Sequence, residues 1–126
     1  MKFTLTYGEL LDRALGILEY SDRQGRETFA KEMTDLVLAE LWDINNRLRL
    51  AKGLPALEEI PCVNDFSDEI PYENELARRD LILGLVCRLS ADEEDSSLHN
   101  FYSTEYAIAK REHRDRTELV VDDFYS

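Results

Sequence analysis

The sequence predicts an all-α protein: a bundle of about four helices with a long ordered prolyl loop and an extended C-terminal arm. Apolar residues recur at intervals of three and four along most of the chain, which is the spacing of one helix face. Only five Gly and three Pro occur in 126 residues, so long loops should be few. Hydrophobic residues make up 44% of the chain, which is enough for one core in one domain.

The first helix is expected to begin near Thr6. Thr6 and Glu9 have the spacing of a capping box, in which each side chain satisfies a free backbone donor. Leucine and alanine then recur at helical spacing. The helix should end between Glu19 and Ser21, because the polar segment that follows contains Gly25.

A second, longer helix is expected from about Thr28 to Lys52. At 1.5 Å per residue its length is roughly 37 Å. Gly53 and Pro55 follow directly and form the expected stop signal. The predicted core stripe of this helix steps by three or four residues and comprises Phe29, Met33, Val37, Leu41, Ile44 and Leu48, widened by Leu36 and Trp42.

Residues 54–71 form the longest irregular segment. Pro61 and Pro71 lack the N–H that a helix interior needs. The segment is rich in apolar residues, so we expect it to be ordered, with a short strand at 59–63 as one option. Loops of this length in small domains are often interaction sites. The candidate contact residues in it are Leu57, Ile60, Phe66 and Ile70.

A third helix is expected to start near Tyr72. Its part at 81–89 is apolar almost all round, which predicts burial on several sides. Gly84 costs about 1 kcal/mol in a helix interior, so we expect another helix to approach closely there. A polar cluster at 92–97 marks the next break. The fourth helix should run from about Ser97 to Arg114, with Tyr102 and Tyr106 on its inner stripe.

The C-terminal residues differ in character from the helix before them. We divide the chain into a helical domain, 1–114, and an arm, 115–126. Residues 119–121 favour extended structure, and a monomer would bury the apolar side chains of the arm poorly. The arm is therefore predicted to dock on another chain; the alternative is a tail folded on its own domain or frayed. The candidate binding residues of the arm are Leu119, Val120, Val121, Phe124 and Tyr125.

The net charge of −12 excludes a basic nucleic-acid footprint. Such a charge suits a soluble protein, a protein with a basic partner, or the wall of a channel through which DNA slides. The basic tract at 110–116 has two interpretations, a partner-binding site beside the arm or an ordinary solvated face. No run of about 18 apolar residues occurs, so no membrane span is expected, and the N-terminus lacks the pattern of a signal peptide.

Catalytic chemistry finds no support. His99 and His113 lack spaced partners and are expected on the surface. Cys62 and Cys87 are expected to be free thiols, with Cys87 in the core; a disulfide between them is the alternative. We therefore predict no enzyme activity, no cofactor and no metal.

Within the first two predicted helices, three carboxylate pairs have the spacing with which all-α nucleotide pyrophosphatases hold Mg²⁺. With 27 acids among 126 residues, chance alone gives about six such pairs, so they indicate solvated helix faces. The pairs are Glu9 with Asp12, Glu32 with Asp35, and Glu40 with Asp43.

Several strings along the chain occur in a set order. They are Leu36 to Trp42 followed by Asn45-Asn46-Arg47-Leu48-Arg49, then Lys52-Gly53-Leu54-Pro55-Ala56-Leu57, Ile60-Pro61, Asp68-Glu69-Ile70-Pro71-Tyr72, Leu89 to Asp95, and Phe101-Tyr102 to Tyr106. In these strings the chain resembles the head–tail connector (adaptor, head completion) proteins of tailed phages, especially phages or prophages of low-GC Gram-positive bacteria. The resemblance covers roughly residues 5 to 112.

The resemblance implies a structural, non-enzymatic protein of the virion neck, assembled in the host cytoplasm. Such proteins form a ring, commonly a dodecamer, beneath the portal protein. The ring extends the DNA channel without binding DNA specifically and meets the next connector or tail protein. In this family the C-terminal arm often embraces the portal, and the prolyl loop can take part in ring or tail contacts. Two alternatives remain: an acidic interaction module such as a DNA-mimic inhibitor, and a Mg²⁺-dependent nucleotide pyrophosphatase.

Overall fold

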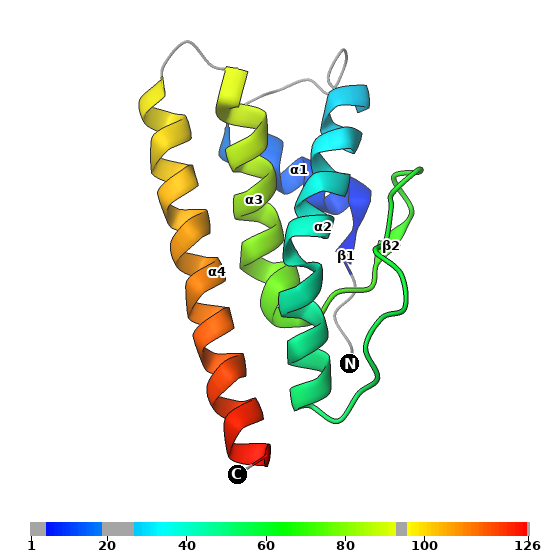
Figure 1. The fold of residues 1–126 in the computed structure, drawn as a ribbon. Coiled ribbons are helices and arrows are strands. Elements are labelled where there is room, and N and C mark those ends of the chain that lie inside the picture. Colours follow the sequence, from blue (N-terminus) through cyan, green and yellow to red (C-terminus); the bar gives the residue numbers. More distant parts are fainter. Residues whose placement is uncertain (1–4, 19–26, 93–95, 126) are drawn as a thin grey trace.

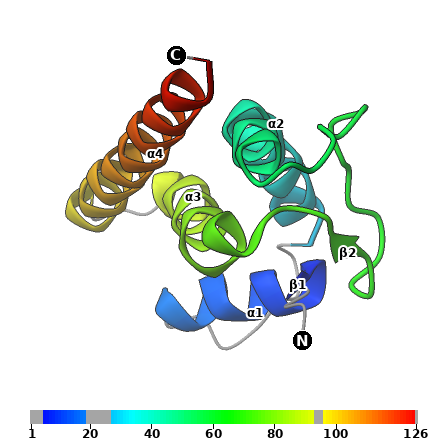
Figure 2. The same cartoon turned by 90° about the horizontal axis from the view of Figure 1, so that it is seen from below.

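The computed structural model describes residues 5–18, 27–92 and 96–125, with the backbone alone described at Glu27, Asp92, Ser96 and 115–125. Its main elements are four helices: α1 (Tyr7–Ile17), α2 (Glu27–Ala51), α3 (Leu81–Leu89) and α4 (Ser96–Tyr125). The short α3 lies at the centre and packs against α1, α2 and α4 (Figures 1 and 2). The predicted all-α bundle of about four helices is confirmed.

The two short strands tie the chain start to the prolyl loop. β1 (Leu5–Thr6) pairs antiparallel with β2 (Glu69–Ile70), and Leu5 lies opposite Ile70. Both of these side chains are buried. The strand considered at 59–63 is wrong: that segment has no strand, and its one buried side chain, Val63, belongs to the core.

Helix α1 begins as expected. Thr6 is its N-cap, and the Thr6 hydroxyl oxygen accepts from the backbone N–H of Glu9 at 3.2 Å. The Glu9 carboxylate bonds the Thr6 hydroxyl at 3.1 Å instead of a backbone donor, so only half of the predicted box forms. The helix ends at Ile17, and the predicted stop at 19–21 lies outside the described residues.

Helix α2 ends at Ala51, two residues before Gly53, close to the predicted end at Lys52. Gly53 has φ +79°, a left-handed conformation that residues with a Cβ rarely adopt. The N–H groups of Gly53 and Leu54 then bond the last-turn carbonyls of Leu50 and Arg49. The buried face of α2 differs in part from the predicted core stripe. Leu38, which was not predicted, is fully buried, whereas Phe29 and Leu36 lie on the surface.

The third helical segment is less regular than predicted. A π-helical turn, Leu76–Asp80, leads directly into α3, and a 3₁₀ turn, Ser90–Asp92, follows it. Gly84 faces both neighbours of α3. A Cβ built there would lie 2.8 Å from Val37 Cγ1 on α2 and 2.9 Å from the Tyr106 ring on α4. The expected close approach exists, with side chains rather than backbone as the nearest atoms.

The extended conformation predicted for the arm is wrong. Helix α4 continues through Tyr125, so the backbone of residues 119–121 is helical (Figure 1). No Gly or Pro occurs after residue 96, and the tract at 110–118 is rich in Lys, Arg and Glu, which are good helix formers. These residues carry the helix through two valines whose intrinsic helix preference is weaker by only a few tenths of a kcal/mol.

Candidate functional site

Polar side chains of α2 hold the prolyl loop in place. Asn46 bonds both backbone groups of Leu57, accepting from its N–H at 2.9 Å and donating to its C=O at 3.5 Å. Asp35 accepts from the N–H of Val63 at 3.0 Å. Arg49 Nε donates to the carbonyl of Pro55 at 2.7 Å. An irregular segment has few backbone partners of its own, so these side chains replace them and the loop is ordered, as predicted.

The start of α1 anchors the other end of the loop. The N–H of Tyr7 donates to the carbonyl of Asp68 at 2.8 Å, and the N–H of Gly8 donates to that of Phe66 at 2.9 Å. The Phe66 ring stacks on the Tyr7 ring with centroids 5.5 Å apart. Asp68 accepts from the backbone N–H groups of Asn64 and Asp65, and these donors hold the pKa of its carboxyl below the ordinary value.

The four loop residues predicted to make contacts have different environments. Ile70 is 2% exposed and belongs to the core, so its side chain is not on the surface. Leu57 is half-buried. Ile60 and Phe66 are 45% and 39% exposed and remain candidates. Leu54, at the start of the loop, has a similar exposure of 39% and was not predicted as a contact residue.

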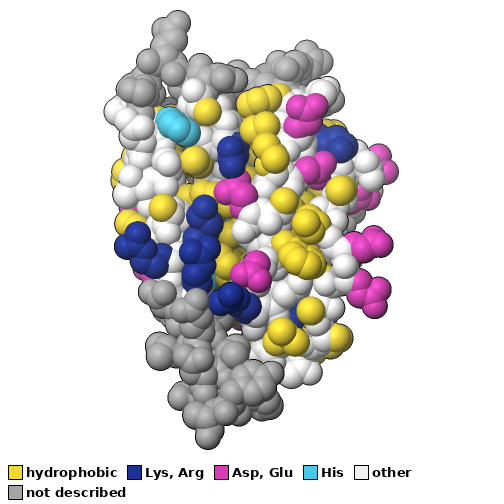
Figure 3. Space-filling model, viewed as in Figure 1, with side chains coloured by type: hydrophobic (Ala, Val, Ile, Leu, Met, Phe, Trp, Pro, Cys, Tyr) yellow, Lys and Arg dark blue, Asp and Glu magenta, His cyan; other side chains and the backbone are white. Residues whose placement is uncertain are grey.

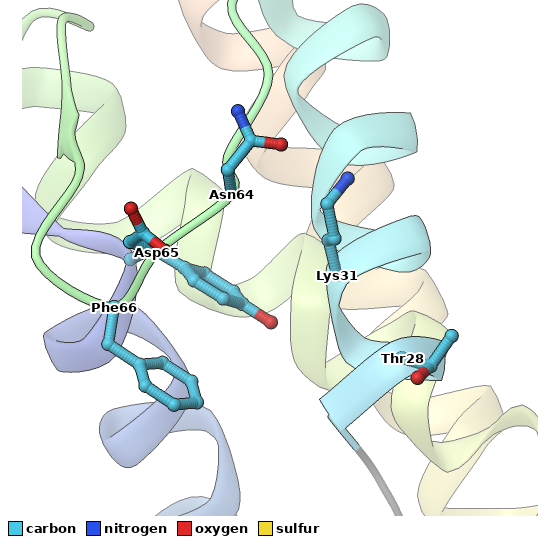
Figure 4. A pocket seen from close by; sticks show the side chains of 6 residues that line it. Thr28, Lys31, Asn64, Asp65 and Phe66 are labelled. Carbon is cyan, nitrogen blue, oxygen red and sulfur yellow. The ribbon is translucent and has the colours of Figure 1, made fainter.

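A hollow of about 250 Å³ opens between the loop and α2. Asn64, Asp65 and Phe66 form its loop side, and Thr28 and Lys31 of α2 lie opposite (Figure 4). The Lys31 amine is already engaged, at 3.1 Å from Asp35. The hollow is therefore a shallow, mixed surface beside an aromatic ring, suited to a partner's side chain more than to catalysis.

The surface of the loop is acidic. Residues 54–71 contain five acidic and no basic residues. Four of these carboxylates are exposed, and none of the salt bridges among the described residues includes them. We name them the acidic edge: Glu58, Glu59, Asp65 and Glu69.

The outer face of α4 has the opposite character. Phe101 and Ile108 are 57% and 44% exposed. Arg111 and Arg114 are exposed on the same helix, and Lys110, at the edge that faces α2, lies 3.5 Å from Glu40 and 4.2 Å from the centre of the Tyr106 ring. Lys and Arg gather on the α4 side of the view in Figure 3, whereas Asp and Glu are prominent on the loop side. We name Phe101, Ile108, Lys110, Arg111 and Arg114 the basic face.

The arm residues Leu119, Val120, Val121, Phe124 and Tyr125 lie in the last turns of α4. Their side chains are outside the described part of the structure, so their predicted role is untested.

The inner face of α4 contains a buried polar pair that sequence reasoning missed. His113, expected on the surface, is 5% exposed, and Asp80 is fully buried. His113 Nε2 lies 3.1 Å from Asp80 Oδ1, and Arg79 Nε lies 3.2 Å from the same oxygen. Burial raises the pKa of the Asp80 carboxyl. A usable signal existed, because His113 continues the inner stripe of Tyr106 and Ala109 at helical spacing.

A second buried carboxylate joins α2 to the start of the third helical segment. Glu73 is 8% exposed and lies 3.2 Å from Arg49 and 3.1 Å from Lys52. Its N–H donates to Asn45 at 2.8 Å. Both ends of Glu73 are therefore held by the last turns of α2, which fixes the two ends of the prolyl loop relative to one another.

Three of the carboxylates considered for Mg²⁺ form ion pairs with Lys or Arg. Glu40 bonds Arg88 and Lys110, Asp35 bonds Lys31, and Asp43 lies 3.2 Å from Arg47. Within the described residues no group of three metal-ligating side chains occurs.

His99 is half-buried, with Nδ1 3.0 Å from the carbonyl of Cys87. The two cysteines are free, Cys62 exposed and Cys87 buried.

No protein-family model matches the sequence, and comparisons with curated proteins and with solved structures find no significant match. None of the helices, over their described residues, is long and apolar enough to cross a membrane.

Proposed function

We propose that this chain is a structural head–tail connector (adaptor) protein of a tailed phage or prophage. It forms a ring beneath the portal, extends the DNA channel and joins the head to the tail. The portal, neighbouring copies and a downstream connector or tail protein are its partners. The observation that carries the proposal is the stretch from Trp42 to Tyr72, which, with the helices around it, resembles the connector family.

The anchoring of that string supports the proposal. Asn46 and Arg49, both in the resembling part of α2, bond the loop backbone at Leu57 and Pro55. These bonds restrain the backbone that precedes the exposed Ile60, and the N–H of Gly8 restrains it at the exposed Phe66. A surface that is rigid before binding loses less conformational entropy when a partner docks, which suits an assembly protein.

The portal protein from the same genome provides the test. Purified chain and portal rings are mixed and sedimented together, with unrelated protein rings as the control. Co-sedimentation with the portal alone is expected. If the chain stays in the supernatant although both partners are folded, the connector role is rejected, and displacement of DNA from a DNA-binding enzyme becomes the next assay.

A further inference from the structure

The prolyl loop, which contains the acidic edge, and α4, which contains the basic face, lie on opposite sides of the molecule. In both ribbon views the loop lies beyond α2 on one side, and α4 lies on the other (Figures 1 and 2). Two copies cannot bring their acidic edges together without repulsion, because residues 54–71 carry no cation. The complementary pairing is between the loop of one copy and α4 of the next.

Apolar side chains accompany the charges on both surfaces. In the loop, the exposed Ile60 follows Glu59 and the exposed Phe66 follows Asp65, both of the acidic edge. Phe101 and Ile108 lie on α4, and Arg111 follows Ile108 by three residues on the same helical face. Each surface thus combines an apolar centre with a charged rim of one dominant sign, which is the usual anatomy of a protein interface.

Two acidic residues, Glu105 and Glu112, occur among the α4 residues whose side chains are described. Glu112 is held by Arg79 at 3.1 Å, at the edge of the inner face. Glu105 is exposed and lies between Phe101 and Ile108 at helical spacing, in the N-terminal half of the described face. The positive charge is therefore concentrated in the C-terminal half of the described face.

We infer that the acidic edge of one copy docks on the basic face of a second copy, head to tail. This contact deepens the proposed function, because it names the surfaces that join neighbouring subunits. After two copies dock in this way, one copy still has a free basic face and the other a free acidic edge. Repetition then produces a closed ring or an open chain, not a symmetric dimer.

The exposed Cys62 in the loop provides a natural probe for the test. In an Ile108→Cys variant, a short bis-maleimide should join Cys62 of one copy to the introduced thiol at position 108 of the next and give a ladder of dimers and higher oligomers. Ile17→Cys on α1 is the matched control, because Ile17 and Ile108 have similar exposure, 41% and 44%. A ladder no stronger than that of the control, or one that survives an added Cys62→Ser change, overturns the inference.

Charge reversal tests the pairing independently. Arg111→Glu with Arg114→Glu, in the Ile108→Cys chain, should weaken association about fivefold. Adding Glu58→Lys and Glu59→Lys should restore it, because both surfaces then change sign. All four side chains are exposed, so circular dichroism should be unchanged. Failure of the restoration rejects the pairing.

Portal co-sedimentation of the same variants separates the two proposals. Absence of the ladder with retained portal binding rejects this contact and leaves the connector role standing. A ladder without portal binding rejects the connector role and leaves the contact standing.

Discussion

His113 Nε2 lies 3.1 Å from Asp80 Oδ1, in a pair that is almost completely removed from solvent. The pair joins α4 to the π turn that precedes α3. The second carboxylate oxygen of Asp80 has no partner among the described residues, so the bond to His113 and the one to Arg79 are its compensation for burial. This polar join adds to the apolar packing of Tyr106 and Ala109 that positions α4, and with it the basic face.

Removal of the imidazole should destabilise the fold. In His113→Ala, the buried Asp80 loses one of its two compensating groups, and the free energy of unfolding should fall by about 3 kcal/mol. Urea denaturation followed by circular dichroism measures this change. His99→Ala is the matched control and should have the smaller effect, because His99 is only half-buried. Equal effects of the two variants would contradict the proposed importance of the pair.

The raised pKa of Asp80 predicts a pH dependence of definite sign. Unfolding releases Asp80 to its ordinary pKa of 3.8, whereas burial raises the pKa in the folded protein. Between these two pKa values the folded state holds more protons, so this group's contribution to stability falls as pH rises. Wild type should therefore lose stability relative to Asp80→Asn as pH is raised from about 4 upward. A wild-type advantage that grows with pH over this range would contradict the prediction.

Gly84 should not tolerate a side chain. Gly84→Ala places a Cβ 2.8 Å from Val37 Cγ1 and 2.9 Å from the Tyr106 ring. Overpacking costs about 1–3 kcal/mol, and the gain in helix propensity of about 1 kcal/mol offsets only part of it. Gly16→Ala is the control, because its Cβ would meet no atom within 4 Å. Thermal unfolding should show a lower midpoint for Gly84→Ala and an unchanged or higher one for Gly16→Ala.

Asn46 should control the order of the prolyl loop. Asn46→Ala removes both bonds to the Leu57 backbone and should cost about 1–2 kcal/mol. Hydrogen exchange at the Leu57 amide and protease cleavage in 54–62 should both become faster. Arg47→Ala, next to it but in an exposed pair with Asp43, should change neither by much. Unchanged exchange at Leu57 would show that the loop is held by other contacts.

The end of α4 should be dispensable for folding and necessary for portal attachment. Deletion of residues 117–126 removes the last turns of α4, which lie beyond the buried Tyr106, Ala109 and His113. The helical circular dichroism of the remaining chain should persist, with binding to portal rings lost. Intact portal binding by the truncated chain would reject the arm as the attachment site.

The apolar spacing and the stop signals predicted much of the fold. The Thr6 cap, the Gly53 stop and the close packing at Gly84 follow from local chemistry that the sequence displays directly. The continuation of α4 to Tyr125 could not be predicted from Leu119–Val121 alone, because helix propagation depends on neighbours as well as on residue preference.

The site residues were harder to predict for a different reason. Ile60 and Ile70 are identical in type, yet one is exposed and the other lies in the core. An irregular segment has no periodicity from which to infer its inward face. The anchors Asp35, Asn46 and Arg49 act across 28, 11 and 6 residues, respectively, so no local pattern reveals them. His113 was wrongly expected on the surface, although its helical phase with Tyr106 and Ala109 indicated burial.

The mass of the complex with portal rings from the same genome tests the connector role most directly. Native mass spectrometry of the mixture should show a gain of about a dozen copies of this chain per portal, with no gain on unrelated rings. No gain in mass, with both partners folded, would contradict the account.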